Sequence, residues 1–352
     1  MKQIKIGKYL INNNRTFITF EAGATHNGLK SAKQLIDIAS DAGADAIKFQ
    51  LFDKQNLLSD KKQIINFKYL NRNNKVLEKK ESLYKIFERR QLNENEWIKL
   101  KNYADKKKIL FFLTVGGFDE LKIAKKLDCP SIKIASGDIS FYPLIRKVAK
   151  LKKNIQLDTG NSTNEEIIKV IKLIEKEGNK NIIIHYCPPG YPARYDDVAI
   201  KNILKLRKFF KYPIAYSDHS PNFDIDIMAV TLGVPLIEKT ITENKYKKEI
   251  EHMFSLEKKE ASIFVNTIRN IEKTLKTSSY SKKNFLKSRY SLRRSVYLDQ
   301  EVKKDSYLKK AKIKFMRPQN GITPIEYEKM LNYKFKKNFS KNSVVKKSYL
   351  KN

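Results

Sequence analysis

Residues 17–28, FITFEAGATHNG, join a β-strand pattern to a loop through one carboxylate, Glu21. Phe, Ile and Thr favour strands, whereas the polar, glycine-containing segment after Glu21 is typical of a turn. Short apolar runs of this kind recur along the chain, and most are apolar on both faces, as buried parallel strands are. The eight runs are TFITFE (16–21), AIKFQ (46–50), ILFFLT (109–114), SIKIAS (131–136), NIQLDT (154–159), NIIIHY (181–186), PIAYSD (213–218) and PLIEKT (235–240).

Amphipathic helical patterns separate the strand runs, and several of them end on glycine, the usual residue at a helix C-terminus. Examples are SAKQLIDIASDAG (31–43), FDELKIAKKL (118–127), NEEIIKVIKLIEKEG (164–178) and DIDIMAVTLG (224–233). Eight strand–helix units within about 260 residues predict an α/β fold, a closed (β/α)8 TIM barrel. An open doubly wound sheet is the alternative, but no run is followed by the glycine-rich turn of a dinucleotide site.

Two insertions and a C-terminal extension add to this repeat. Residues 53–90 are polar and rich in Lys and Asn, and we expect a loop with a helix that folds over the barrel mouth. Residues 187–200 form a Pro-rich loop, and the helical pattern at 256–276 should close the barrel. The expected domains are a barrel at 1–276, a basic, Ser-rich linker at 277–289 and a small β-rich unit at 290–352.

The chain is long enough, at 352 residues, for one large domain plus a small one, and 41% of its residues are hydrophobic. No apolar run approaches the roughly 18 to 20 residues of a membrane span, and the basic N-terminus has no apolar signal-peptide segment. Cys129 and Cys187 are too few for a disulfide framework and lack metal-ligand spacing. We therefore expect a cytoplasmic protein without a membrane partner.

The formal net charge is +34, from 72 Lys and Arg against 38 Asp and Glu. Such an excess would fit nucleic-acid binding if it formed one basic stripe. Instead the lysines are spread over almost every segment, alongside abundant Asn and Ile, so we expect no nucleic-acid partner. The charge should still favour encounters with anionic small molecules.

Polar residues gather at the C-terminal ends of the strand runs, which line the active site in a barrel of this kind. Lysines beside Ser and Thr hydroxyls suit a phosphate or carboxylate, and carboxylates beside a histidine suit a metal or acid–base chemistry. Together they predict a barrel enzyme with an anionic substrate. These residues are Glu21, Lys48, Gln50, Thr114, Lys133, Ser136, Asp158, His185, Ser217, Asp218, His219, Glu238 and Lys239.

Seven motifs occur in order and at fitting separations: FEAGATHNG, GADAIKFQLF, IKIASGD, LDTGNST, GYPARYDDV, AYSDHS and GVPLIEKT. In these motifs the chain resembles the sialic acid synthase family, which includes N-acetylneuraminate, legionaminic acid and pseudaminic acid synthases. RRSVYLDQEVKK and FMRPQNGITPIEYEKMLNYKFKKNF are similar to the family's C-terminal antifreeze-like (SAF) domain. The resemblance therefore spans about residues 17–345.

The resemblance implies a transferase that condenses phosphoenolpyruvate with an open-chain N-acyl hexosamine aldehyde, such as N-acetylmannosamine, for surface glycan synthesis. In this family C3 of the enolpyruvate attacks the aldehyde carbon, water adds at C2, and phosphate leaves as its C–O bond breaks. A divalent metal, Mn²⁺ or Mg²⁺, acts as a Lewis acid on the aldehyde oxygen. The resemblance also implies a domain-swapped homodimer.

The resemblance also implies roles for individual residues. The catalytic residues would be Glu21, His219 and Glu238, and His219 would also be a metal ligand. Phosphoenolpyruvate would bind to Lys48, Thr114, Lys133, Ser136 and Ser217. The acceptor sugar would bind to Gln50, Tyr191 and Arg317, the last reaching in from the SAF domain of the neighbouring subunit. Glu21 would handle a proton or orient water, and the lysines would offset the phosphate charge.

Four positions depart from the family pattern. Thr240 stands where a second metal-binding histidine is usual, so metal affinity should fall, or Mg²⁺ should be preferred. Asp158 stands where a phosphate-binding hydroxyl is expected, and it would repel the phosphate unless a metal or a lysine lies between them. Pro189 replaces a polar contact, and Glu251, beside His252, replaces the usual aspartate.

Two other functions are compatible with these departures. One is an aldolase-type lyase in the same barrel that acts on a related keto-sugar acid. The other is a catalytically weak, non-enzymatic relative that binds a partner synthase or a sugar. The retention of Glu21, Lys48, Lys133, His219 and Arg317 favours the active synthase.

Overall fold

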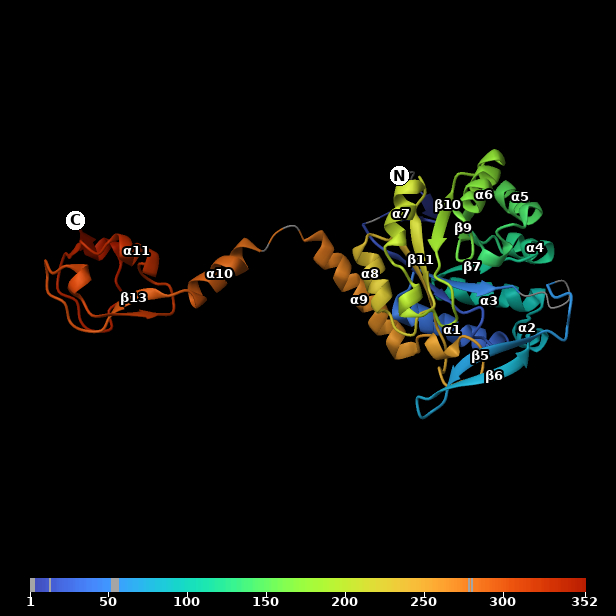
Figure 1. The fold of residues 1–352 in the computed structure, drawn as a ribbon, viewed down its shortest axis with the longest axis horizontal. Coiled ribbons are helices and arrows are strands. Elements are labelled where there is room, and N and C mark those ends of the chain that lie inside the picture. The colour runs from blue at the N-terminus through green and yellow to red at the C-terminus, as the bar shows by residue number, and fades with distance from the viewer. Residues whose placement is uncertain (1–3, 13, 52–56, 278, 280) are drawn as a thin grey trace. The chain divides into compact units, whose positions relative to one another are not determined.

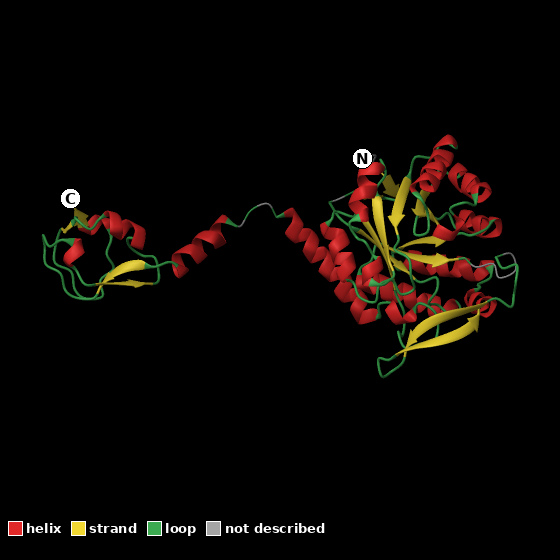
Figure 2. Cartoon of the chain, in the orientation of Figure 1, coloured by secondary structure: helices red, strands yellow, loops and turns green. Residues whose placement is uncertain are grey.

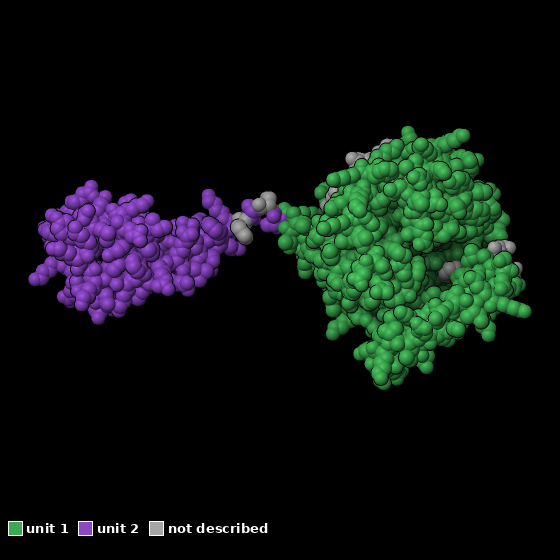
Figure 3. All heavy atoms as spheres, viewed as in Figure 1, with its two compact units in different colours: residues 1–276 green, residues 277–352 purple. Residues whose placement is uncertain are grey.

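The computed structural model describes residues 4–12, 14–51, 57–277, 279 and 281–352. The chain divides into two compact units, residues 1–276 and 277–352, which Figure 3 shows in green and purple. Each unit has its own hydrophobic core. None of the helices in the described ranges is long and apolar enough to cross a bilayer.

Within the described residues, eight parallel strands of the first unit form a closed barrel in the order β10-β11-β12-β3-β4-β7-β8-β9 (Figure 1, Figure 2). The strands are β3 (Phe17–Glu21), β4 (Ala46–Gln50), β7 (Leu110–Thr114), β8 (Ser131–Ile134), β9 (Asn154–Asp158), β10 (Ile182–Tyr186), β11 (Ile214–Asp218) and β12 (Leu236–Thr240). Each strand lies inside one of the eight runs expected from the sequence. The predicted TIM barrel is confirmed.

The barrel strands are rich in β-branched and aromatic residues because both of their faces are covered, one by the barrel interior and one by helices. All five residues of β3 are buried, Glu21 included. The strand register brings Glu21 level with Lys48 on one side and with Thr240 on the other. The C-terminal residues of the strands therefore meet at one mouth of the barrel.

Helices surround the barrel and place their apolar faces against it, as the helical spacing of apolar residues predicts. They are α1 (Leu29–Ala42), α3 (Glu94–Lys106), α4 (Phe118–Lys126), α5 (Tyr142–Lys150), α6 (Asn164–Lys176), α7 (Asn202–Phe209), α8 (Asp224–Thr231) and α9 (Lys258–Lys276). Capping boxes at Asn93 and Thr163 start α3 and α6. Helix α1 ends at Gly43, whose φ of 82° lies in the left-handed region that glycine tolerates.

The insertion after β4 differs from the expected loop. An antiparallel hairpin of β5 (Ile64–Leu70) and β6 (Val76–Ser82) precedes α2 (Leu83–Arg90), so the expected helix is present but follows two strands. The side chain of Asn71 shapes the turn by accepting hydrogen bonds from two backbone N–H groups. Polar residues on the exposed faces of both strands hide their alternating pattern in the sequence. Residues 53–56 of the predicted insertion lie outside the described residues.

Another hairpin, of β1 (Ile4–Ile6) and β2 (Tyr9–Ile11), precedes the barrel. Its isoleucines are buried in the main core. The side chain of Asn181, just before β10, donates a hydrogen bond to the Lys5 carbonyl at 3.0 Å. Because Asn181 lies at the amino end of its strand, this hairpin covers the end of the barrel opposite the mouth.

Short strands and turns make up the second unit. It contains the antiparallel pairs β13 (Ser295–Leu298) with β14 (Ile313–Met316) and β15 (Lys334–Phe335) with β16 (Leu350–Lys351), and the helix α11 (Pro324–Lys329). Helix α10 (Lys282–Leu292) extends through much of the segment expected to be a linker, 277–289. None of its residues, all of them described, is buried, so no apolar stripe marks this helix in the sequence.

Candidate active site

One polar side chain from each barrel strand lies in the interior at the C-terminal end. We call these eight residues the inner ring: Glu21, Lys48, Thr114, Lys133, Asp158, His185, Ser217 and Glu238. Several of their contacts cross the barrel, which places them on its inner face. All are buried except Asp158, whose side chain is 13% exposed. The alternation of side chains along each strand explains why one residue per strand end reaches this layer.

Lys133 lies at the centre of the inner ring. Its Nζ is 2.7 Å from Glu238 Oε1 and 3.0 Å from Asp158 Oδ2. Ser217 Oγ and His185 Nδ1 are each 3.5 Å from the same nitrogen. Burial alone would lower the pKa of Lys133, but Asp158 and Glu238 outweigh it and raise that pKa. Lys133 is therefore a permanent cation whose donors already have partners.

Lys48 is the second cation of the inner ring. It is ion-paired with Glu21, donates a hydrogen bond to Thr114 Oγ1 at 3.0 Å and lies 3.3 Å from Glu238 Oε1. Glu21 Oε1 also accepts hydrogen bonds from Gln50 Nε2, at 3.3 Å, and from the backbone N–H two residues further on. These contacts engage both carboxylate oxygens of Glu21 and fix its orientation at the mouth.

Three carboxylates face two ammonium groups in the inner ring. Burial would raise the pKa of Glu238, but Lys133 and Lys48 outweigh it and hold that pKa below its ordinary value. For Glu21 and Asp158, burial outweighs the nearby lysines and raises the pKa. Glu238 therefore stays ionised, whereas the other two carboxylates bind protons more readily than in water.

His219 follows β11 at the edge of the inner ring. Burial lowers its pKa to about 4, so its imidazole is neutral near pH 7. Its Nδ1 lies 3.7 Å from the Cys187 Sγ, and the ring of Tyr191 packs with its centroid 4.5 Å away. A neutral imidazole is able to bind a metal ion, as the resemblance implies for His219.

The side chains at the mouth do not fit a divalent cation held by protein ligands alone. Among the described residues, no group of three or more His, Cys, Asp or Glu side chains is arranged to hold a metal ion. Thr240 is buried where the resemblance predicts a second histidine, and its Oγ1 has no hydrogen-bond partner in the described part of the chain. His219 thus lacks the histidine partner that the family pattern would provide.

Two strand-end residues that the sequence groups with the site do not reach it. Lys239 is fully buried, ion-paired with Asp218, and its Nζ lies 3.5 Å from Asp226 Oδ2 of α8. Asp218 also accepts a hydrogen bond from the Tyr216 hydroxyl at 2.8 Å. Because successive strand residues face opposite sides, the residue after an inward one points outward. This buried cluster therefore fastens α8 to the barrel wall.

Arg90 of α2 joins three segments at the Glu21 side of the mouth. It is buried, its Nε donates to the Ala24 carbonyl at 2.7 Å, and its Nη2 lies 3.2 Å from Glu249 Oε2. Asn27 donates to the other oxygen of Glu249 at 3.0 Å. The insertion is thereby linked to the loops after β3 and β12. Sequence analysis misses Arg90 and Glu249 because their partners are far away in the chain.

Glu251 lies in the loop after β12, close enough to Glu21 of the inner ring to feel its charge. Burial and repulsion from Glu21 raise the pKa of Glu251 to about 8. Its φ of 70° is uncommon for a residue with a side chain, so the fold around it determines this local conformation. The adjacent His252 is turned away, with its Nδ1 2.6 Å from Thr242 Oγ1.

The other predicted site residues occupy different places. Gln50 contacts Glu21 and Tyr191 packs on His219, so both lie at the mouth. Ser136 begins a short 3₁₀ helix just after β8 and is half-buried outside the inner ring. Arg317 is exposed in the second unit, directly after β14. The structure thus brings together, at one barrel mouth, the predicted residues Glu21, Lys48, Gln50, Thr114, Lys133, Tyr191, Ser217, His219 and Glu238.

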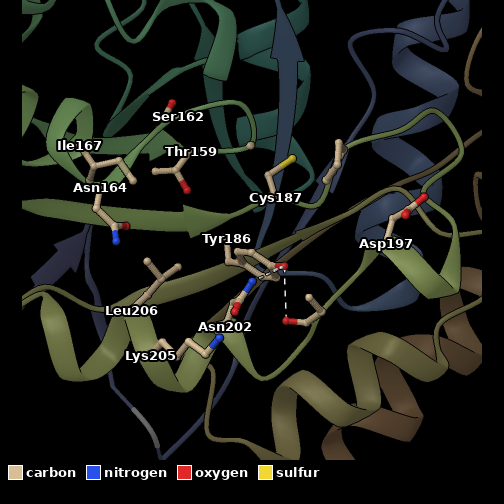
Figure 4. Close-up of a pocket in the computed structure, with 13 residues that line it drawn as sticks. Thr159, Ser162, Asn164, Ile167, Tyr186, Cys187, Asp197, Asn202, Lys205 and Leu206 are labelled. Atoms are coloured by element: carbon tan, nitrogen blue, oxygen red, sulfur yellow. Dashed lines mark hydrogen bonds between the residues drawn. The ribbon is translucent and has the colours of Figure 1, made fainter.

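A cavity of about 390 Å³ opens beside the inner ring, between the segments after β9 and β10 (Figure 4). Thr159 and Cys187 line it on one side, and Pro189 belongs to its wall. On another side Asn202 donates a hydrogen bond to the Tyr186 hydroxyl at 3.4 Å. The predicted Pro-rich loop therefore borders both this cavity and the mouth.

A closed parallel barrel whose mouth joins lysines, carboxylates and hydroxyls defines a TIM-barrel enzyme for an anionic substrate. The model of the NeuB family matches residues 35–280. The chain belongs to the NeuB family. This finding confirms the resemblance to sialic acid synthases that the seven motifs indicate.

Individual relatives are similar over nearly the whole chain. An uncharacterized protein of Methanocaldococcus jannaschii is 34% identical over 351 residues, 98% of each chain. The N,N'-diacetyllegionaminic acid synthase of Campylobacter jejuni subsp. jejuni is 32% identical over 340 residues, 94% of this chain and 99% of that protein. A crystal structure of the sialic acid synthetase from Leptospira borgpetersenii serovar Hardjo-bovis aligns with a TM-score of 0.69 at 29% identity, over 83% of this chain and 97% of that one.

Proposed function

We propose that this protein is a nonulosonic acid synthase, a transferase that condenses phosphoenolpyruvate with an open-chain N-acyl hexosamine aldehyde for glycan synthesis. The meeting of Lys48, Lys133 and Glu21 in one inner ring carries the proposal. Two ammonium groups suit a donor that bears a phosphate and a carboxylate. A carboxylate beside them is able to serve the proton transfers of a condensation. Membership of the NeuB family supports the same reaction.

The donor would bind to Lys48 and Lys133 through its charged oxygens. The hydroxyl of Thr114 lies 3.0 Å from the Lys48 ammonium, and that of Ser217 lies 3.5 Å from the Lys133 ammonium. Both hydroxyls are therefore placed to donate to an anion held by the lysines. Ser136, next to the ring, is a further proposed contact.

In the proposed reaction, C3 of the enolpyruvate bonds to the aldehyde carbon, and the aldehyde oxygen takes up a proton. Water adds at C2 and loses a proton, and the C–O bond to phosphate then breaks to leave a 2-keto acid. Glu21, fixed by Lys48 and Gln50, would handle a proton or orient the water. Glu238 stays ionised and would stabilise positive charge that develops at C2. His219 is the third proposed catalytic residue.

The acceptor sugar would bind on the Glu21 side of the mouth, through Gln50 and Tyr191. We further propose that the second unit is a SAF domain and that its Arg317 binds the N-acyl end of the sugar in the barrel of a neighbouring subunit. The RPQNG motif around Arg317 and the exposure of this arginine support that role. A domain-swapped homodimer would follow.

NeuB-family synthases are generally metal-dependent, and a bound divalent cation supplies Lewis-acid chemistry. Because Thr240 lacks an imidazole, we propose that Mn²⁺ or Mg²⁺ is held weakly here, with His219 as a protein ligand. We also propose a cytoplasmic location. Cys129 and Cys187 support it, since both are unlinked and buried thiols.

One observation favours a binding-only relative as a second candidate: Asp158 already engages Lys133, where a donor phosphate would bind. The test incubates the protein with phosphoenolpyruvate, Mn²⁺ or Mg²⁺, and either N-acetylmannosamine or a 2,4-diacetamido-trideoxyhexose. Keto-sugar-acid product that requires both substrates supports the synthase. Binding without turnover would support the binding-only relative, and cleavage of a keto-sugar acid without phosphoenolpyruvate would support an aldolase-type lyase.

A further inference from the structure

The carboxylate of Asp158 would repel the phosphate of any phosphorylated donor. Its Oδ2 lies 3.0 Å from Lys133 Nζ, and the same nitrogen lies 2.7 Å from Glu238 Oε1. Lys133 is 1% exposed, so water does not screen these contacts. The ammonium group on which the donor phosphate would rest is therefore already balanced by two carboxylates of the protein.

The net charge of the inner ring adds to this repulsion. Glu21, Asp158 and Glu238 carry three negative charges when ionised, against two positive charges on Lys48 and Lys133. A phosphate monoester adds about 1.5 to 2 negative charges at neutral pH, since its second pKa is about 6. Like charges a few ångströms apart repel strongly in a buried site, so neutralisation of one carboxylate would stabilise the phosphate there.

The contacts select Asp158 for this neutralisation. Glu238 lies between both lysines, which hold its pKa below the ordinary value. Both oxygens of Glu21 are engaged, by Lys48, Gln50 and a backbone N–H group. Asp158, in contrast, is paired with Lys133 through Oδ2, and its side chain is 13% exposed, against 3% for Glu21 and 5% for Glu238, so solvent protons reach it most easily. Its Oδ1, like Glu21 Oε2 and Glu238 Oε2, accepts no hydrogen bond from any residue that the structure describes. Burial also raises the pKa of Asp158 despite the nearby lysines.

The neighbours of Asp158 include Lys133, Glu238 and His185, and near pH 7 these three groups keep one charge state. Asp158 and Glu238 raise the pKa of Lys133, the lysines lower the pKa of Glu238, and burial lowers the pKa of His185 well below its ordinary value, so they are a cation, an anion and a neutral ring. Lys48 also faces Asp158, as a further lysine neighbour. Burial and the Asp158 charge also raise the pKa of the Cys187 thiol, which stays neutral. Asp158 is therefore the group in this part of the ring whose charge is able to change.

We propose that Asp158 takes up one proton from solvent when the phosphorylated donor binds, and that its neutral carboxyl then donates a hydrogen bond to the phosphate. The incoming phosphate takes over the place of Asp158 beside Lys133. This inference rests on the proposed function, because it assumes phosphoenolpyruvate as the donor. It makes Asp158 a residue that determines how donor affinity depends on pH.

The direction of that dependence follows from linkage. Repulsion by the phosphate raises the pKa of Asp158 in the complex above its value in the free protein. Between those two values the complex holds a proton that the free protein has released, so donor affinity falls as the pH rises. The fall approaches about tenfold per pH unit for one coupled proton.

Isothermal titration calorimetry of the full chain with phosphoenolpyruvate tests this proposal. At one pH, the apparent binding enthalpy is measured in buffers of different ionisation enthalpy, and the slope gives the number of protons taken up. The wild type should take up about one proton more than Asp158→Asn, which keeps the shape but cannot ionise. The variant should also bind the donor more tightly than the wild type above pH 8.

Asp158→Ser gives a second test if the asparagine variant fails to fold, and it should behave in the same way. The matched control is Asp128→Asn, a surface carboxylate that lies 2.7 Å from Lys153 Nζ and should leave proton uptake unchanged. Equal uptake by the wild type and by both Asp158 variants would overturn the inference while the proposed function stands. A wild-type protein that binds no phosphoenolpyruvate would overturn the proposed function itself.

Discussion

Lys133 Nζ and Glu238 Oε1 lie 2.7 Å apart although their strands, β8 and β12, face each other across the barrel. Within the described barrel these strands are separated by three others in either direction, so the ion pair spans the interior. Both side chains are at most 5% exposed. Removal of one partner leaves a buried charge, which makes this contact structural as well as a proposed part of the donor site.

Replacement of Lys133 by Met should abolish donor binding and lower the free energy of unfolding by about 3 kcal/mol, because Glu238 and Asp158 lose their shared cation. Urea denaturation and calorimetry with phosphoenolpyruvate measure the two effects. Lys153→Met removes a surface partner of Asp128 and should cost less than about 1 kcal/mol. A Lys133→Met protein with wild-type stability and donor affinity would contradict the assignment.

Replacement of Glu21 by Gln should lower the turnover number by about 100-fold or more, since general acid–base groups contribute about that much. The amide keeps the size of the side chain, so phosphoenolpyruvate affinity should change by only a small factor. Product formation and calorimetric binding are measured on the same preparation. Full activity in this variant would remove Glu21 from the chemistry.

Replacement of Thr240 by His should strengthen Mn²⁺ binding by at least about tenfold, or about 1.4 kcal/mol. The threonine Oγ1 has no hydrogen-bond partner among the described residues, so the change breaks no such contact there. Free Mn²⁺ is followed by electron paramagnetic resonance, and Thr240→Val serves as the control that adds no ligand. A folded histidine variant with unchanged affinity would show that residue 240 does not share a cation with His219.

Glu251 should make the protein less stable as the pH rises toward 8. Its pKa is raised to about 8 in the folded chain, from 4.5, by burial and by the charge of Glu21. Between those values the folded state holds a proton that the unfolded state has lost. The stability that Glu251 contributes is therefore fully present below its pKa in the unfolded chain. It is lost as the pH rises through its pKa in the folded chain, and the free energy of unfolding falls by up to about 1.4 kcal/mol per pH unit.

The measurement is the difference in the free energy of unfolding between pH 5 and pH 8, for the wild type and Glu251→Gln. The variant should lose less stability over this interval. Histidines such as His219, whose pKa is lowered to about 4, act in the opposite direction below their unfolded value, but they do so in both proteins. Parallel stability curves for the two proteins would contradict the raised pKa of Glu251.

Replacement of Arg90 by Lys should weaken the contacts that hold the loops after β3 and β12 to α2, while the positive charge is kept. A lysine cannot hold the Ala24 carbonyl and Glu249 with the geometry of a guanidinium. We expect the free energy of unfolding to fall by about 1 to 3 kcal/mol and the KM for the acceptor sugar to rise more than kcat falls. Arg146→Lys, at a surface contact with Glu177, is the control. An unchanged KM would exclude this positioning role for Arg90.

The barrel is predictable from the sequence because each strand run carries its own local signal. The run SIKIAS ends early, at Ile134, because the next residues turn into a 3₁₀ helix. The β5–β6 hairpin is not predictable in the same way. Phe67 is the one buried residue of these two strands in the described structure, so they show no regular alternation of apolar and polar residues.

The site is predictable only as a set of strand ends. Those ends include Lys48, Lys133 and Glu238, but they do not show that both lysines share Glu238 across the barrel. They also include Lys239, which the strand alternation turns outward toward α8. Arg90 is missed because its partners are brought together only by folding. Local patterns therefore locate the mouth, and long-range contacts determine its chemistry.

Phosphoenolpyruvate labelled with ¹⁸O at the oxygen between carbon and phosphorus gives the most direct test of the central claim. The wild type is incubated with the labelled donor, a divalent cation and the acceptor amino sugars, and both products are measured by mass spectrometry. The Campylobacter jejuni relative serves as the positive control. The account predicts one labelled phosphate for each keto-sugar acid formed, because the C–O bond breaks. Absence of the keto-sugar acid with every acceptor, or retention of the label in the organic product, would contradict it.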